Sequence, residues 1–431
     1  MKIRLGFALA AGALGAAAQW SEWRGGMAAG VGDGLNLPTE WSETRNIAWK
    51  TEIPGRGLSS PALAGGLIFL TTSFEGDVIE GRKPPIHYLN GQLFLNPDST
   101  SGNRRQTLKV LAVDAASGKI VWERTSYEGP VYDDRIRKNT YASPTAAADG
   151  KRVYAWFESQ GLYAYERDGR PAWKASFGDM GSHGTGPGTS PILYGDLLLL
   201  QCDIEGDSFL AGISTRDGKV VWKSKRKERL GWSTPLLMRD GGRTRLVLAA
   251  TSSTVVYDPS NGEELWRGPG LESNAVPTPV AGQGMVFVMS GHPSKRVLAF
   301  KPGGAEAPAW KYEKGVGYVP SPVLYGDHLY VISDTGLLTC LDARTGALVY
   351  EGKRPPKPAR VTASLVAFDG KLLVTSEDGD TFVIRAGPEH EVLRTNSVGE
   401  PVWASPALAP GVIYLRGARH LYSIRAPAAG E

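Results

Sequence analysis

Short stretches in which hydrophobic and polar residues alternate recur along the chain, separated by turns that contain Gly or Asp. In the unit that begins at Ser321, a short apolar stretch ends in a Gly-Asp turn, and residues 329–333 and 337–342 alternate on either side of a turn ending at Gly336. A turn closed by Gly346 precedes a fourth stretch. Period-two alternation is typical of half-buried strands, and Gly is favoured where a turn needs positive φ. The pattern predicts four short antiparallel strands per unit.

A Ser/Thr-Pro step marks each unit. The steps begin at Ser60, Ser143, Ser190, Thr234, Thr278, Ser321 and Ser405, and Ser364-Leu365 is a degenerate member that fills the remaining gap. Successive steps lie 41 to 47 residues apart, except for a first interval of 83. Eight four-stranded units at this period predict an all-β fold, a single eight-bladed β-propeller.

An aromatic residue recurs on the expected fourth strand of the units. It is Trp122, Trp173, Trp222, Trp266, Trp310 or Tyr350 in successive units. Because its position is so regular, we expect it to pack one blade against the next rather than to stack on a cofactor.

The last unit ends after its third strand, residues 421–425, and an open blade would leave an exposed strand edge. Residues 46–52 resemble the missing Trp-bearing fourth strand. We therefore expect the N-terminal strand to complete the last blade and close the ring. The propeller is predicted to span residues 46–425, with an insertion at about 74–106 in blade one. Residues 19–45 are a predicted lead-in lying across the ring, and 426–431 a C-terminal tail.

The first residues are typical of a cleavable signal peptide. Lys2 and Arg4 precede an apolar, Ala-rich stretch of about 14 residues, too short to span a bilayer, and Ala16 to Ala18 suit cleavage before Gln19. Residues 1–18 are thus a predicted signal peptide, with no transmembrane segment after cleavage and no nearby Cys for lipidation. We expect a periplasmic or secreted protein.

Charge and motifs exclude several functions. Loss of Lys2 and Arg4 lowers the formal net charge from +4 to +2, which gives no concentrated basic face for nucleic acid. The two cysteines, Cys202 and Cys340, fall in different repeats, so we expect no disulfide. The carboxylates from Asp203 to Asp207 miss the spacing of a calcium loop, so no metal site is predicted.

Candidate binding residues lie in the loops that lead into the innermost strands, because these loops surround one mouth of a propeller channel. They are Arg56, Lys138, Asn139, Tyr141, His183, Trp232, Asn274, Tyr318, Arg360, Glu400 and Trp403. Cations, amides and aromatics in one place suit an anionic or planar ligand, with Glu400 as a partial counter-charge. The alternative is a water-filled funnel. No catalytic residue can be assigned.

Two segments depart from the repeat and are candidates for a function particular to this chain. One is the insertion at 74–106, and the other is the long link from Glu123 to Tyr141. The alternative is a surface flap held by internal ion pairs.

The Ser-Pro strand, the D-x-x-[TS]-G turn and the following Trp resemble the repeat of pyrroloquinoline quinone (PQQ)-binding-like propellers. That superfamily includes quinoprotein dehydrogenases and the propeller lipoprotein of the outer-membrane Bam complex. Residues 20–25, 37–42, 53–57 and 137–144 resemble a group of exported bacterial propellers named only for the repeat. The resemblance implies the propeller fold over about 380 residues.

Three functions stay open, and the third of them is an enzyme or sensor that uses another ligand in the same funnel. The favoured one is an exported, non-catalytic binding or scaffold propeller, holding a cell-envelope protein or a small anionic or planar ligand at its rim or funnel. The second is a PQQ-dependent oxidoreductase, with PQQ and Ca²⁺ as cofactors and Arg56, Lys138, Asn139 and Arg360 receiving the quinone. The chain departs from that branch in lacking the adjacent Cys pair that stacks on the quinone, and from the lipoprotein branch in having Gln19 where a lipidated Cys would stand.

The signal-peptide prediction can be tested directly. Protein recovered from an exporting host should begin at or near Gln19, because cleavage follows the small residues of the signal. Intact-mass spectrometry measures this, and a product that retains residues 1–18 would contradict the prediction.

Overall fold

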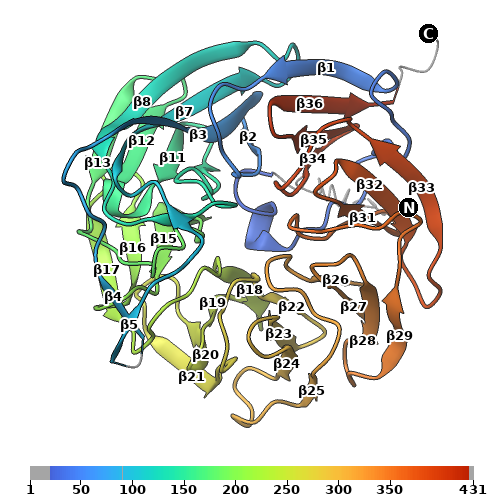
Figure 1. Ribbon diagram of the computed structural model, residues 1–431. Helices are drawn as coiled ribbons and strands as arrows, with labels where there is room; N and C mark the ends of the chain where they lie inside the picture. Colours follow the sequence, from blue (N-terminus) through green and yellow to red (C-terminus); the bar gives the residue numbers. More distant parts are fainter. Residues whose placement is uncertain (1–19, 90, 427–431) are drawn as a thin grey trace, which may run out of the picture.

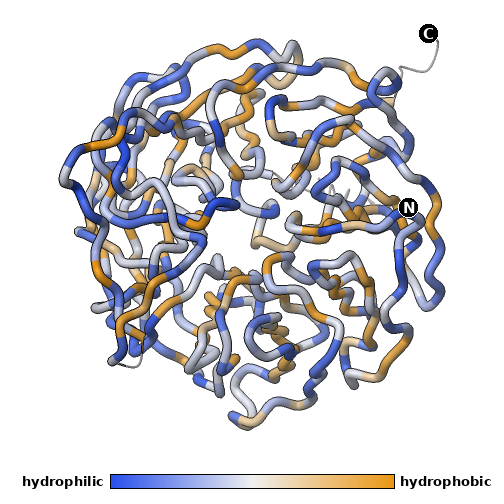
Figure 2. Tube along the Cα trace, viewed as in Figure 1, coloured by the Kyte–Doolittle hydropathy of each residue, from blue (hydrophilic) through white to orange (hydrophobic). Residues whose placement is uncertain are grey.

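Each predicted unit forms one four-stranded antiparallel sheet, and eight such sheets stand as blades around a central axis (Figure 1). This computed structural model describes residues 20–89 and 91–426, so the predicted signal peptide lies outside the described residues. Hydrophobic and hydrophilic segments are interspersed around the ring (Figure 2). Within the described ranges, no helix is long and apolar enough to cross a membrane. The predicted all-β, eight-bladed propeller is confirmed.

The blades follow chain order. Blade one consists of β2 (Ala62–Ala64), β3 (Leu67–Val78), β7 (Arg104–Asp114) and β8 (Ile120–Pro130). Blade two consists of β10 (Ala147–Ala148), β11 (Arg152–Trp156), β12 (Leu162–Glu166) and β13 (Pro171–Ala175). Blade three consists of β14 (Ile192–Tyr194), β15 (Leu197–Cys202), β16 (Phe209–Ser214) and β17 (Val220–Lys225). Blade four consists of β18 (Leu236–Asp240), β19 (Arg243–Ala249), β20 (Ser253–Tyr257) and β21 (Glu264–Pro269).

The second half of the ring repeats the plan. Blade five consists of β22 (Val280–Gly282), β23 (Met285–Ser290), β24 (Arg296–Phe300) and β25 (Trp310–Tyr312). Blade six consists of β26 (Val323–Tyr325), β27 (His328–Ile332), β28 (Leu338–Asp342) and β29 (Leu348–Lys353). Blade seven consists of β30 (Val366–Phe368), β31 (Lys371–Thr375), β32 (Asp380–Arg385) and β33 (Val392–Ser397). Blade eight consists of β34 (Ala407–Ala409), β35 (Val412–Arg416), β36 (His420–Arg425) and β1 (Ile47–Glu52).

The remaining elements are small. The two 3-10 helices are η1 (Gly26–Ala28) and η2 (Glu158–Gln160). Between β3 and β7, a hairpin of β4 (His87–Leu89) and β5 (Gln92–Phe94) is followed by β6 (Ser99–Thr100), which pairs with β9 (Arg135–Ile136). We call residues 79–103 the flap. The flanking residues of the predicted insertion extend the blade strands, since Phe74 pairs with Thr107 and Glu75 with Gln106.

A belt of hydrogen bonds joins the inner strands around the axis. Each blade contributes one belt residue, in ring order Ser60, Thr145, Ser190, Thr234, Thr278, Ser321, Ser364 and Ser405. Seven of them, all but Thr234, donate their N–H to the hydroxyl of the next belt residue at 2.9–3.1 Å, and Ser405 donates to Ser60. The hydroxyl of Thr278 instead accepts from the indole of Trp23. The degenerate Ser364 thus holds its predicted place. In blade two the predicted step at Ser143 is displaced, because Thr145 occupies the belt position.

The recurring aromatics pack each blade against the next, as predicted. In five blades the indole N–H donates to a backbone carbonyl in the turn between the third and fourth strands of the following blade. The pairs are Trp49 with Ala115, Trp122 with Arg167, Trp173 with Thr215, Trp266 with Gly304 and Trp310 with Ala343. Glycines in these turns make room for the rings. A Cβ at Gly118, Gly169, Gly218, Gly262 or Gly346 would lie 2.3–2.8 Å from the neighbouring Trp ring, and each has positive φ. The turn motif therefore serves the contact between blades.

The ring closes as predicted, because β1 pairs antiparallel with β36. Trp49 lies opposite Ser423, and Thr51 lies opposite Leu421. The first described strand is therefore the outermost strand of blade eight, and it satisfies the edge that β36 would otherwise expose.

The lead-in lies across the axis and contacts all eight blades (Figure 1, blue). From blade one to blade eight, its contacts are Trp20 with Leu63, Ser21 with Ala148, Glu22 with Leu193, η1 with β18, Trp23 with Thr278, Arg24 with Pro322, Gly32 with Ala367, and Leu35 with Gly411. Several of these partners lie at or beside the turns between first and second strands. The lead-in therefore covers that end of the ring, and the opposite end is the mouth.

Two charged side chains of the lead-in are buried. Glu22 accepts a 2.6 Å hydrogen bond from the Leu193 N–H, and burial raises its pKa to about 8. Arg24 donates to the carbonyls of Pro322 and Leu365 at 2.7 and 2.9 Å, and burial lowers its pKa to about 9. The segment thus places two ionisable groups where their charged forms are disfavoured.

Replacing Glu22 with Gln should change how stability depends on pH. The pKa of Glu22 is about 8 in the folded chain and 4.5 as a free group, so the wild-type protein loses stability as pH rises from 4.5 and levels off above 8. Gln keeps an acceptor for Leu193 without a charge. The melting temperature of Glu22→Gln relative to that of the wild type should be higher at pH 9 than at pH 5.5. An equal difference at both pH values would contradict this.

Candidate functional site

The mouth brings together loops from blades one, two and seven. The Arg56 side chain donates to the Arg137 carbonyl at 3.0 Å, next to Lys138. Lys138 Nζ lies 3.3 Å from an oxygen of Glu377, whose own N–H donates to the Arg360 carbonyl at 2.7 Å. The loops that carry the three predicted cations are thus linked, and the side chains of all three are exposed.

Glu377 is the carboxylate at the mouth that the sequence analysis missed. It lies in the turn between β31 and β32, and Thr362 donates a 2.7 Å hydrogen bond to it. Glu400, the predicted counter-charge, is instead buried in blade eight, where it accepts from the His420 N–H at 3.0 Å. Burial favours a higher pKa for Glu400, but the bonds from His420 outweigh it and lower the pKa. Turns between second and third strands face the mouth too, and this geometric signal identifies Glu377.

The predicted amides and aromatics mostly hold the loops of the mouth together. Asn139 donates to Thr185 and Pro187, Tyr141 to Asp133, Trp232 to Gly186, and Asn274 to Tyr318, all by side-chain hydrogen bonds of 2.8–3.2 Å. Tyr141 is buried, and Trp403 is half-buried. These side chains therefore have structural partners, and their role as a ligand site stays a prediction.

His183 lies beside the flap, in a group we call the histidine–carboxylate cluster: His87, Asp133, His183 and Glu205. The His87 ring lies between two acids, with Nδ1 2.7 Å from Glu205 Oε2 and Nε2 2.9 Å from Asp133 Oδ1. His183 Nε2 lies 3.6 Å from Glu205 Oε1, and the two His rings are 5.4 Å apart. Asp133 also accepts from the N–H and hydroxyl of Ser182 at 2.7 and 3.0 Å. The cluster ties the flap to loops of blades two and three.

The environments of the two histidines shift their pKa values in opposite directions. Burial lowers the pKa of His183. Burial would also lower that of His87, but the hydrogen bond to Glu205 and the charge of Asp133 outweigh it, so the pKa of His87 is raised. His87 therefore holds its proton more strongly than a free imidazole does, and His183 holds it less strongly.

The flap hairpin has two unlike faces. His87 lies opposite Phe94, and these residues face the cluster, where the Phe94 ring is 5.3 Å from that of His183. Tyr88 lies opposite Leu93 on the other face, and their exposed fractions are 57% and 59%. With Ile86, Leu89 and Leu95, they make five of the fourteen exposed large hydrophobics in the described residues. Leu89 pairs with Gln92 on the His87 face, so the outward face consists of Tyr88 and Leu93, with Ile86 and Leu95 flanking the two strands, and it is an exposed apolar patch.

Polar contacts fix the base of the flap. Ser99 donates to the Gly184 carbonyl at 2.6 Å, and the Gly102 N–H donates to Asp134 at 2.6 Å. Arg82 donates to the Gly102 carbonyl at 3.2 Å. Figure 1 shows the flap crossing the front of the neighbouring blades. These bonds hold the hairpin as a defined platform.

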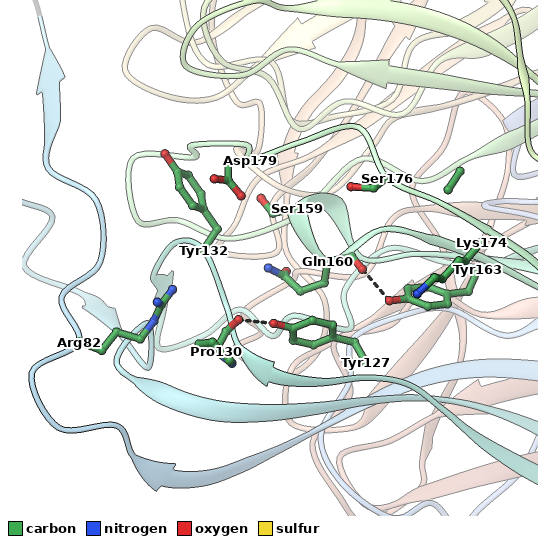
Figure 3. Close-up of a pocket in the computed structure, with 11 residues that line it drawn as sticks. Arg82, Tyr127, Pro130, Tyr132, Ser159, Gln160, Tyr163, Lys174, Ser176 and Asp179 are labelled. Atoms are coloured by element: carbon green, nitrogen blue, oxygen red, sulfur yellow. Dashed lines mark hydrogen bonds between the residues drawn. The ribbon is translucent and has the colours of Figure 1, made fainter.

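A groove of about 600 Å³ lies between the flap, β8 and blade two (Figure 3). Arg82, Tyr132, Lys174 and Asp179 are among its polar lining residues. Burial raises the pKa of Tyr132, and the charges of Asp179, Asp133 and Glu205 add to this effect. Tyr132, which lines the groove, directly precedes Asp133 of the histidine–carboxylate cluster in the chain.

The residues do not match the quinone site that the resemblance implies. Cys202 and Cys340 are free and buried, in β15 of blade three and β28 of blade six. They cannot form the stacked disulfide between adjacent cysteines. Lys138 is paired with Glu377, so its charge is already matched.

The family described as outer membrane protein assembly factor BamB matches residues 106–351, more than half of the chain. Similar solved structures include BamB from Moraxella catarrhalis, with 12% identity and a TM-score of 0.54 over 82% of this chain and 99% of that one. Quinohemoprotein alcohol dehydrogenase from Comamonas testosteroni has 10% identity and a TM-score of 0.60 over 96% and 83% of the two chains. A europium-containing methanol dehydrogenase has 11% identity and a TM-score of 0.52 over 94% and 90%. No curated protein sequence matches the chain. These structural likenesses show the fold.

The mouth can be tested as an anion site. The double variant Arg56→Gln/Arg360→Gln should keep the wild-type melting temperature, since both side chains are exposed. Its affinity for a polyanionic probe, PQQ, should fall at least about tenfold in calorimetry, because each charge-assisted hydrogen bond stabilises binding by about 1.5–3 kcal/mol. Arg170→Gln/Arg216→Gln, on exposed blade turns, is the control. Equal affinity of variant and wild type, or no binding by the wild type, would contradict an anion site.

Proposed function

Because the chain belongs to the family of the outer membrane protein assembly factor BamB, a family of PQQ-like β-propellers, we propose that it is a non-catalytic binding protein of the cell envelope. In this proposal the ring is a rigid scaffold and the flap is the surface that holds a protein partner. The outward face of the flap hairpin is the observation that carries it.

That face has the character of a contact surface. Tyr88 and Leu93 pair across the hairpin and both point outward, although a solvated strand face is normally polar. Burying large apolar side chains stabilises a complex by about 1.5–3 kcal/mol each, before the cost of ordering the partners. The polar contacts at the base of the flap lower that cost on this side, because they fix the hairpin in advance.

Two features argue against a quinoprotein enzyme. The chain has no adjacent cysteines, and Cys202 and Cys340 lie in different blades. The lysine expected to receive a quinone is paired with Glu377. The oxidoreductase therefore remains the second candidate, and binding of PQQ with Ca²⁺ followed by alcohol-dependent dye reduction would establish it in place of the scaffold.

A photo-crosslinking residue at Leu93 tests the partner surface in living cells. Val221, on the outer strand β17, is the matched control, because the two side chains are 59% and 58% exposed. We expect a discrete protein adduct from position 93 and none from 221. The variant Leu93→Ser/Leu95→Ser should weaken binding of the purified adduct protein at least about tenfold in calorimetry, since two apolar contacts are lost.

The variant Val220→Ser/Val221→Ser should bind that protein as the wild type does. Adducts of equal yield from positions 93 and 221, or unchanged affinity of the flap variant, would contradict the flap as the partner surface.

A further inference from the structure

The histidine–carboxylate cluster has the composition of a transition-metal site. His87, His183 and Glu205 each offer one ligand atom, and these atoms all lie within 4.8 Å of one another. Two ligands of a tetrahedral Zn²⁺ at 2.0–2.1 Å lie about 3.3 Å apart. Glu205 reaches one imidazole with each oxygen, since Oε2 lies 2.7 Å from Nδ1 of His87 and Oε1 lies 3.6 Å from Nε2 of His183. Small side-chain movements therefore bring the set to metal geometry.

We propose that His87, His183 and Glu205 bind a Zn²⁺ ion. Two imidazoles and one carboxylate suit Zn²⁺, whereas Ca²⁺ takes oxygen ligands.

Asp133 is the outer partner of this site. It lies 2.9 Å from Nε2 of His87, so it accepts that N–H and leaves Nδ1 to face the metal. Asp133 is itself fixed by the N–H and hydroxyl of Ser182. A carboxylate that orients a ligating histidine in this way is a regular feature of zinc sites.

The backbone at His183 adds an independent observation. Its φ is 54°, in the left-handed region that costs energy for a residue other than Gly. This conformation directs the ring to the flap, next to His87.

Metal binding exchanges a proton for the ion. Without metal, a proton between Nδ1 of His87 and Glu205 accounts for their 2.7 Å separation. Zn²⁺ takes its place, and the proton leaves to solvent. The three ligands come from the flap, the loop leading into blade three and the turn between β15 and β16, so the ion fastens the flap to blade three.

Calorimetry of the chelator-treated protein with ZnCl₂ tests the site. We expect one Zn²⁺ per chain at pH 7.5, and no comparable binding of Ca²⁺. His183→Ala should weaken Zn²⁺ binding more than 100-fold, and Asp133→Asn by about 10–100-fold, as for other outer partners. His328→Ala in blade six should bind as the wild type does.

Co²⁺ gives a second readout that does not depend on stability. The wild-type protein should show the visible absorption of tetrahedral Co²⁺, and folded His183→Ala, checked by circular dichroism, should not. Zn²⁺ binding that is absent, or unaffected by His183→Ala, would overturn the site and leave the cluster as an ion-paired anchor. Neither experiment involves the protein partner, so the metal site and the partner surface succeed or fail separately.

Discussion

The hydrogen bonds between successive inner strands determine the rest of this structure. In each link a buried N–H of one blade donates to a Ser or Thr hydroxyl of the next, so the inner strands stay in register around the axis. At larger radius, Trp rings bond to turns of the neighbouring blade. Contacts at two radii fix the angle between blades. The positions of the loops that join successive blades follow from that angle, because each of these loops starts on one blade and ends on the next.

The sequence predicted the fold well because a blade is a local object. Its four strands lie within about 45 residues, and period-two alternation with Gly turns marks each of them. The error at Ser143 arose where the repeat is interrupted. The long link before blade two supplies a Ser-Pro step two residues before Thr145, which makes the belt contact. The motif alone could not show which hydroxyl reaches the neighbouring blade.

The site was less predictable because its members meet across long stretches of chain. Lys138 pairs with Glu377 from blade seven, and His87 of the flap lies beside Glu205 of blade three. Nothing near either residue in the sequence indicates its partner. Glu400 was assigned to the mouth by its loop, but its side chain turns toward His420. Which way a side chain points in an irregular loop depends on neighbours that only the folded ring supplies.

The closure between β1 and β36 has a consequence for how the chain reaches this state. These strands lie at opposite ends of the described chain, and the lead-in contacts all eight blades. Neither contact can form until the whole ring exists, so the first strand to emerge has no partner for longest. Local blades can assemble early, whereas pairing between distant strands is slow and leaves a temporary sticky edge. The strand edge that seals the finished ring is therefore the last one to be protected from aggregation.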